Sequence, residues 1–174
     1  VVERLVARHR LPSPRENKSS RVWRGMIMGQ EVMLAEPMTY MNLSGDAAGA
    51  LLRYYRLPLE AMLVVHDELD FSPGQVRLKR GGGPGGHNGL RSIIEHVGSD
   101  FARVRLGVGK PPSADRGADY VLTRFDGVER TVMDKAIEVA ADAVEAVLAD
   151  GFDVAMNRFN RRSIDSDADK ESCE

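Results

Sequence analysis

The sequence predicts a single α/β domain. Short runs typical of β-strands occur between stretches whose apolar residues recur at helical spacing, and the 174 residues match the usual size of one domain. Hydrophobic residues at 43% and charged residues at 29% are ordinary for a globular protein and exclude wholesale disorder. We expect the domain to cover residues 1–162, followed by a disordered acidic tail over residues 163–174.

The amino-terminal half contains helical and hairpin patterns. Its elements are, in order, a helix within residues 1–11, a loop with proline and polar residues, hairpin strands over residues 22–28 and 31–35, and a helix over residues 44–56. Asn42 or Ser44 is expected to cap the second helix. For Asn42 the alternative is a hydrogen-bonding group that points into a cleft, and the local pattern does not decide between the two.

The second half alternates strands and helices. Residues 62–65 are an apolar run suited to a buried strand, and the polar cluster from His66 to Asp70 follows it. The later elements are strands over residues 75–80 and 103–109, with a glycine loop and a helix over residues 90–97 between them, and helices over residues 126–150 and 152–159. Asp126 and Glu129 resemble a capping box for the long helix. Because ligands of open α/β sheets bind at the carboxyl ends of strands, the polar cluster is a candidate site.

Composition excludes several classes of protein. Cys173 is the only cysteine, which rules out a disulfide framework and a cysteine zinc site. No apolar run approaches the roughly 20 residues of a membrane span, and the start lacks the pattern of a secretion signal. We therefore expect a soluble, cytoplasmic protein. Its net charge of −2 gives no overall attraction to nucleic acid, so a site for a polyanion must come from local clusters of Arg and Lys.

Residues 81–89 form a glycine-dense loop that leads directly into a predicted helix. Six of these nine residues are glycine, which is costly in a helix or strand but suits close approach of backbone to a ligand. Backbone amides at a helix start favour an anion, so the pattern indicates phosphate contact, with a plain flexible loop as the alternative. The loop matches neither a Walker A sequence nor a dinucleotide fingerprint. His87 and Asn88 within it are candidate site residues.

Two further groups of residues suggest chemistry. Asp67 lies beside His66, and a carboxylate next to an imidazole is a common general-base arrangement, although His66 equally suits a structural role. Basic side chains alternate with apolar ones on the two strands beside the glycine loop and predict a clamp for backbone phosphate, with scattered surface charge as the alternative. These residues are Arg77, Lys79, Arg80, Arg103 and Arg105.

Four segments together resemble bacterial peptidyl-tRNA hydrolases. They are residues 38–45 (Met-Thr-Tyr-Met-Asn-Leu-Ser-Gly), 66–70 (His-Asp-Glu-Leu-Asp), 81–90 (Gly-Gly-Gly-Pro-Gly-Gly-His-Asn-Gly-Leu) and 101–109 (Phe-Ala-Arg-Val-Arg-Leu-Gly-Val-Gly). The resemblance implies a mixed, twisted β-sheet flanked by helices, a monomer, and hydrolysis of the ester between peptide and tRNA. It also implies that no metal, cofactor, membrane or protein partner is required.

The resemblance assigns roles by motif. Asp67 matches the acid that orients the family's catalytic histidine, and Asn42 matches the asparagine that holds the peptide end and helps to polarise the ester carbonyl. The remaining matches are substrate and tRNA contacts, with the basic residues gripping a phosphate near the tRNA terminus. They are Tyr40, Met41, His87, Asn88, Arg77, Lys79 and Arg105.

One family segment has no counterpart in this sequence. Family members begin with a strand, a Gly-Leu-Gly-Asn-Pro-Gly-like turn and an Arg-His-Asn segment that supplies the catalytic histidine, whereas this chain starts at Val1. We therefore expect the domain to be incomplete at its amino terminus, which puts the activity and stability of the chain as given in question. Two alternatives remain. The first is a non-catalytic RNA-binding protein on the same fold, and the second is a small-molecule hydrolase that uses Asp67 and His66.

Overall fold

The computed structural model describes residues 1–110, 125 and 127–161. These residues fall into two compact units. The hairpin unit comprises Val2–Val64 and Arg80–Arg103, and the α5–α6 unit comprises Val1, Val65–Lys79 and the chain from Val104 onward. Asp126 and the predicted tail over residues 163–174 lie outside the described residues.

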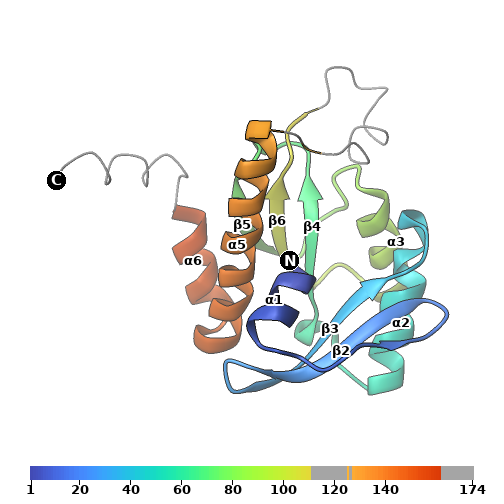
Figure 1. Cartoon of the computed structure of the whole chain (residues 1–174). Coiled ribbons are helices and arrows are strands. Elements are labelled where there is room, and N and C mark those ends of the chain that lie inside the picture. The colour runs from blue at the N-terminus through green and yellow to red at the C-terminus, as the bar shows by residue number, and fades with distance from the viewer. Residues whose placement is uncertain (111–124, 126, 162–174) are drawn as a thin grey trace, which may run out of the picture. The chain divides into compact units, whose positions relative to one another are not determined.

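An antiparallel sheet with strand order β1-β2-β3 lies in the hairpin unit. Its elements, which follow α1 (Val2–Arg8), are β1 (Arg15–Glu16), β2 (Ser20–Ile27) and β3 (Gln30–Pro37). The β2–β3 hairpin is the long ribbon in Figure 1, and its register pairs Trp23 with Leu34. Met28 and Gly29 connect the strands with positive φ values of 50° and 76°, as a two-residue type I′ turn requires. The predicted hairpin is confirmed, whereas β1, at two residues, is too short to show a pattern.

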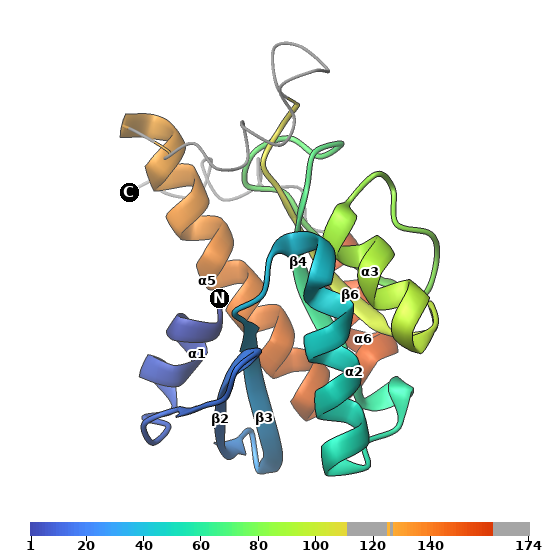
Figure 2. The same ribbon diagram turned by 90° about the vertical axis from the view of Figure 1, so that its right-hand side faces the viewer.

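Two helices of the hairpin unit pack side by side: α2 (Ser44–Tyr55) and α3 (Asn88–Val97) (Figure 2). The short 3₁₀ turn η1 (Met41–Leu43) precedes α2, and η2 (Leu59–Ala61) follows it. Leu90, Ile93 and Phe101 form the buried core beneath these helices. Both helices were predicted. However, α2 has Leu43 at its N-cap position with no capping side chain, so the prediction that Asn42 or Ser44 caps it was wrong.

A second sheet contains β4 (Leu63–Glu68), β5 (Val76–Arg80) and β6 (Ala102–Gly107) in the order β4-β6-β5. Ala102 N–H donates to Met62 O and Val108 N–H to Glu68 O, a constant offset that makes β4 and β6 parallel. Gly81 N–H donates to Phe101 O and Gly107 N–H to Gln75 O, which makes β5 and β6 antiparallel. The sheet is therefore mixed, and the α/β fold class is confirmed.

The position of β6 in the middle of this sheet overturns one expectation. Five of its six residues are buried, including Arg103, which is 3% exposed. The alternation of Arg103 and Arg105 with apolar residues had predicted an exposed basic face. Because a central strand is covered on both faces, the alternation of basic and apolar residues along it does not show which side chains are exposed.

The carboxyl-terminal part of the described chain is a helical pair, α5 (Gly127–Asp150) and α6 (Phe152–Arg161) (Figure 1). Gly151 joins them with a φ of 88°, a conformation that favours glycine, so both the predicted long helix and its end are confirmed. Small side chains line the buried face of α5, among them Ala136, Ala140 and Ala143. Among the described helices, none combines the length and apolarity that crossing a membrane would require.

Candidate functional site

Asp67 lies within β4 of the α5–α6 unit. The sequence had placed His66, Asp67 and Glu68 after the strand, but β4 continues to Glu68, whose carbonyl accepts a hydrogen bond from Val108 N–H directly after β6. Pairing with a neighbouring strand thus extends β4 into a polar segment that propensity alone would have ended. Asp67 is half-buried. The His66 ring faces the main chain, with Nδ1 2.6 Å from the Asp67 carbonyl oxygen.

Arg105 is a half-buried cation on β6 of the same unit. Its Nη1 lies 3.7 Å from Glu68 Oε2, and its guanidinium lies 4.5 Å from the centre of the Phe71 ring. Burial lowers the pKa of Arg105, the neighbouring Glu68 carboxylate opposes that shift, and the positive charge of Arg77 adds to it. The positive charges of Arg77 and Arg105 therefore lie close enough to repel each other.

The other two basic residues that the resemblance matches to the phosphate site, Arg77 and Lys79, differ in their availability. Lys79 is exposed. Arg77 is half-buried, and its Nη1 donates a hydrogen bond to the carbonyl oxygen of Asn160 on α6. Lys79 is thus the cation of this group that presents its charge most openly to solvent.

Asn160 is a structural residue that the sequence analysis missed. Its Oδ1 accepts a hydrogen bond of 2.8 Å from Leu78 N–H, and its Nδ2 donates one of 2.9 Å to Leu78 O. Among the described strands, β5 lies at the edge of its sheet, and this side chain takes the place that a neighbouring strand would occupy. Nothing local marks Asn160, since its partner lies 82 residues earlier in the chain.

In the hairpin unit, three predicted site residues precede α2 and are exposed. Tyr40 is 82% exposed and Met41 is 57% exposed, and both exposed fractions are high for large apolar side chains. Asn42 is also exposed and lies in the middle of η1. With capping excluded, the interpretation of Asn42 as a group available for hydrogen bonding remains.

His87 caps the helix that follows the glycine loop. Its Nδ1 accepts a hydrogen bond of 3.1 Å from Leu90 N–H, and Asn88 beside it is exposed at the first position of α3. The helix start also lies against the segment before α2, because a Cβ on Gly89 would be 2.5 Å from Met41 Sδ. The hairpin unit therefore brings Met41 and Asn42 next to His87 and Asn88.

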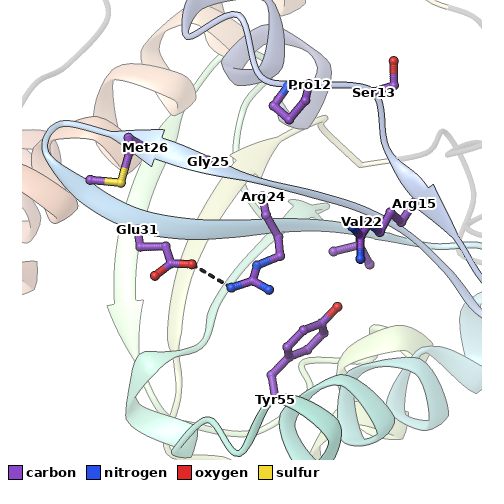
Figure 3. Close-up of a pocket in the computed structure, with 9 residues that line it drawn as sticks. All are labelled: Pro12, Ser13, Arg15, Val22, Arg24, Gly25, Met26, Glu31 and Tyr55. Carbon is purple, nitrogen blue, oxygen red and sulfur yellow. Dashed lines mark hydrogen bonds and ion pairs between the residues drawn. The ribbon is translucent and has the colours of Figure 1, made fainter.

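A separate open pocket of about 760 Å³ lies over the hairpin in the same unit (Figure 3). Arg24 and Tyr55 point into it, with the guanidinium 5.4 Å from the ring centre, and Arg24 Nη2 is 2.6 Å from Glu31 Oε1. None of the predicted site residues lines this pocket. Arg24 pairs with Glu31 there, and Arg15 is a second cation in the lining.

The structure therefore sorts the predicted residues into two groups. In the hairpin unit, exposed polar and apolar side chains gather where α2 and α3 begin, beside a glycine loop. In the α5–α6 unit, Asp67 and the cations lie on β4, β5 and β6. Among the described residues there is no group of three or more His, Cys, Asp or Glu side chains suited to a metal ion.

Fold and side chains together define an α/β protein with exposed polar groups beside a glycine loop in one unit and a half-buried carboxylate with cations in the other. The chain belongs to the peptidyl-tRNA hydrolase family, whose model matches residues 1–167. A peptidyl-tRNA hydrolase of Chloroflexus aggregans is 44% identical over 161 residues, which are 91% of this chain and 86% of the relative. A peptidyl-tRNA hydrolase of Dehalococcoides mccartyi is 49% identical over 145 residues, covering 81% of this chain and 77% of that protein.

Solved structures agree with this assignment. The crystal structure of peptidyl-tRNA hydrolase from Acinetobacter baumannii matches with a TM-score of 0.87 at 40% sequence identity. The match covers 93% of this chain and 83% of that one. At this identity the similarity extends beyond the fold to the family itself.

Proposed function

We propose that this protein hydrolyses the ester bond between peptide and tRNA in peptidyl-tRNA, and so returns tRNA to translation. The observation that carries the proposal is the family membership, together with the exposed Asn42 beside His87 and Asn88. The substrate class places its action in the cytoplasm. We propose further that it acts as a monomer, as one domain over residues 1–162, without a cofactor, a metal or a protein partner.

The individual roles follow from chemistry and motif. Asp67 orients a histidine base that removes a proton from the attacking water, because a carboxylate fixes the tautomer of the imidazole that it contacts. The Asn42 amide donates a hydrogen bond to the ester oxygen as negative charge develops on it. Tyr40, Met41, His87 and Asn88 contact the substrate. Lys79, with Arg77 and Arg105, binds a phosphate of the tRNA without reading its bases.

The base itself is not matched by any of the four histidines. His9 directly follows α1, His66 faces a main-chain carbonyl, His87 caps α3, and His96 of α3 contacts Asp46 of α2. We propose that the base is the histidine of the Arg-His-Asn segment that the family resemblance implies.

The test is release of peptide from a peptidyl-tRNA by the chain as given and by a version extended with a relative's amino-terminal segment. We expect the extended protein to be active. In that protein, Asp67→Asn should lower kcat about 100-fold or more, because an oriented general base contributes that much. The matched control is Asp70→Asn, an exposed carboxylate 3.0 Å from Lys110 Nζ, which should retain activity.

Two outcomes would count against the proposal. An extended protein that binds tRNA but releases no peptide supports the RNA-binding alternative. Equal kcat values for the Asp67→Asn and Asp70→Asn variants remove Asp67 from the mechanism.

A further inference from the structure

Arg103 is a buried cation at the start of β6 in the hairpin unit. Arg103 is only 3% exposed. Burying a guanidinium costs free energy unless strong hydrogen bonds replace those it made with water. A position on the central strand of a sheet would ordinarily hold an apolar residue. The presence of arginine here therefore requires an explanation from its contacts.

The contacts of Arg103 lead to the glycine loop. Nη1 donates a hydrogen bond of 2.8 Å to Gly83 O, and Nη2 donates one to Gly82 O. The guanidinium also lies 4.7 Å from the centre of the Phe101 ring, which is itself fully buried. A planar fork with parallel donors suits two successive carbonyls, and the aromatic ring beneath it fixes the plane of the fork.

The loop has little else to hold its middle in place. Gly82, Gly85 and Gly86 have positive φ values of 94°, 56° and 82°, conformations that glycine adopts freely. A Cβ added at Gly83, Gly85 or Gly86 would have no atom within 4 Å, so side-chain packing does not restrain this stretch. Two main-chain hydrogen bonds hold other parts of the loop: Gly81 N–H donates to Phe101 O, and His87 N–H donates to Pro84 O across Gly85 and Gly86, each 2.9 Å long. Within the described part of the chain, neither Gly82 nor Gly83 takes part in a main-chain hydrogen bond.

We propose that Arg103 is a positioning residue for substrate binding, which acts by fixing the carbonyls of Gly82 and Gly83 and thereby the loop that leads into His87 and Asn88. This inference rests on the proposed function, because it assumes that His87 and Asn88 contact the substrate. Without the two hydrogen bonds from the Arg103 guanidinium, the loop samples many backbone conformations, and it loses that conformational entropy when substrate binds. The penalty therefore falls on affinity, and so on KM more than on kcat.

The test uses Arg103→Met, Arg103→Lys and a matched control in the catalytically active form of the protein. Arg130→Met is the control, because Arg130 forms an exposed surface pair with Asp134 on α5. Hydrogen exchange of the two hydrogen-bonded loop amides, Gly81 N–H and His87 N–H, reports on the loop directly. We expect Arg103→Met to speed this exchange and to raise KM about tenfold, the equivalent of one lost charged hydrogen bond. Kcat should change much less, and Arg103→Lys should fall between Met and wild type.

Several results would overturn the inference. In the wild type, loop amides that exchange as fast as those of an unfolded peptide would show that Arg103 does not hold the loop. If Arg103→Met fails to fold, Arg103→Lys, which keeps a cation and a long stem, decides through its KM and its loop exchange. Unchanged values in that variant contradict the proposal. If the wild type shows a protected loop but releases no peptide, the proposed function fails while the anchoring of the loop stands.

Discussion

At the scale of single residues, hydrogen-bond partners decide what each histidine does. Both ring nitrogens of His96, on α3, face acceptors. Nδ1 lies 2.8 Å from Ser92 O and Nε2 lies 2.8 Å from Asp46 Oδ1. Both nitrogens donate only in the imidazolium form, and the pKa of His96 is raised chiefly by the Ser92 carbonyl and also by Asp46, against a smaller opposing effect of burial.

This arrangement predicts a pH-dependent contribution to stability. A histidine whose pKa is higher in the folded state stabilises it fully below the unfolded value of about 6.5, and the contribution disappears as pH rises through the folded pKa. The destabilisation caused by His96→Gln should therefore be largest near pH 5.5 and shrink toward pH 8.5. Thermal unfolding across this range measures it. Asp46→Asn should weaken the same pH dependence, and a difference between wild type and His96→Gln that grows with pH would contradict the assignment.

At the scale of elements, α2 and α3 are in close contact at one glycine. Gly45 N–H donates a hydrogen bond of 2.9 Å to Ser92 Oγ, and a Cβ on Gly45 would lie 2.1 Å from Ser92 O. Only glycine permits this approach. The contact places the start of α2, and with it Met41 and Asn42, beside α3. The helices thus define the spacing of the candidate residues within the hairpin unit.

Two glycines of α2 provide a matched pair of substitutions. Gly45→Ala should lower the free energy of unfolding by about 1 to 3 kcal/mol, because backbone atoms of α3 have to move. Gly49→Ala should be neutral or stabilising by up to about 1 kcal/mol, since its Cβ would meet the flexible end of Arg53 at 3.1 Å and alanine favours the helix. Chemical denaturation of both variants tests this, and equal effects would show that the close approach is not limiting.

At the scale of the whole molecule, charge is nearly balanced, with a net value of −2. Attraction to tRNA therefore depends on local cations, and of the three proposed clamp residues Lys79 is the most exposed while Arg77 and Arg105 have partners within the protein. Phosphate contacts of this kind release counterions and make binding sensitive to salt.

Removal of Lys79 should change the salt dependence of substrate binding. Lys79→Ala is expected to raise the KM for peptidyl-tRNA several-fold at low salt and to reduce the slope of log KM against log salt by about 1. Lys135→Ala, an exposed lysine on α5, is the matched control and should leave both quantities unchanged. Measurement of KM at three salt concentrations separates a phosphate contact from a structural effect, because a structural effect leaves the slope intact.

The sequence by itself determined the elements whose patterns are local. The hairpin, α2, α3 and the long α5 were all predicted within a few residues, because turn residues and apolar spacing report short-range geometry. Four ordered motifs likewise identified the family that the comparisons confirm.

Only the tertiary structure decided what the individual polar side chains do. Arg103 is buried against glycine carbonyls 20 and 21 residues earlier, Arg77 is bound to Asn160 at a separation of 83 residues, and Asp67 lies inside a strand that pairing with β6 extends. Periodicity describes which face of an element a residue occupies. It contains no information about what covers that face, and burial and hydrogen-bond partners depend on chain segments that are distant in sequence.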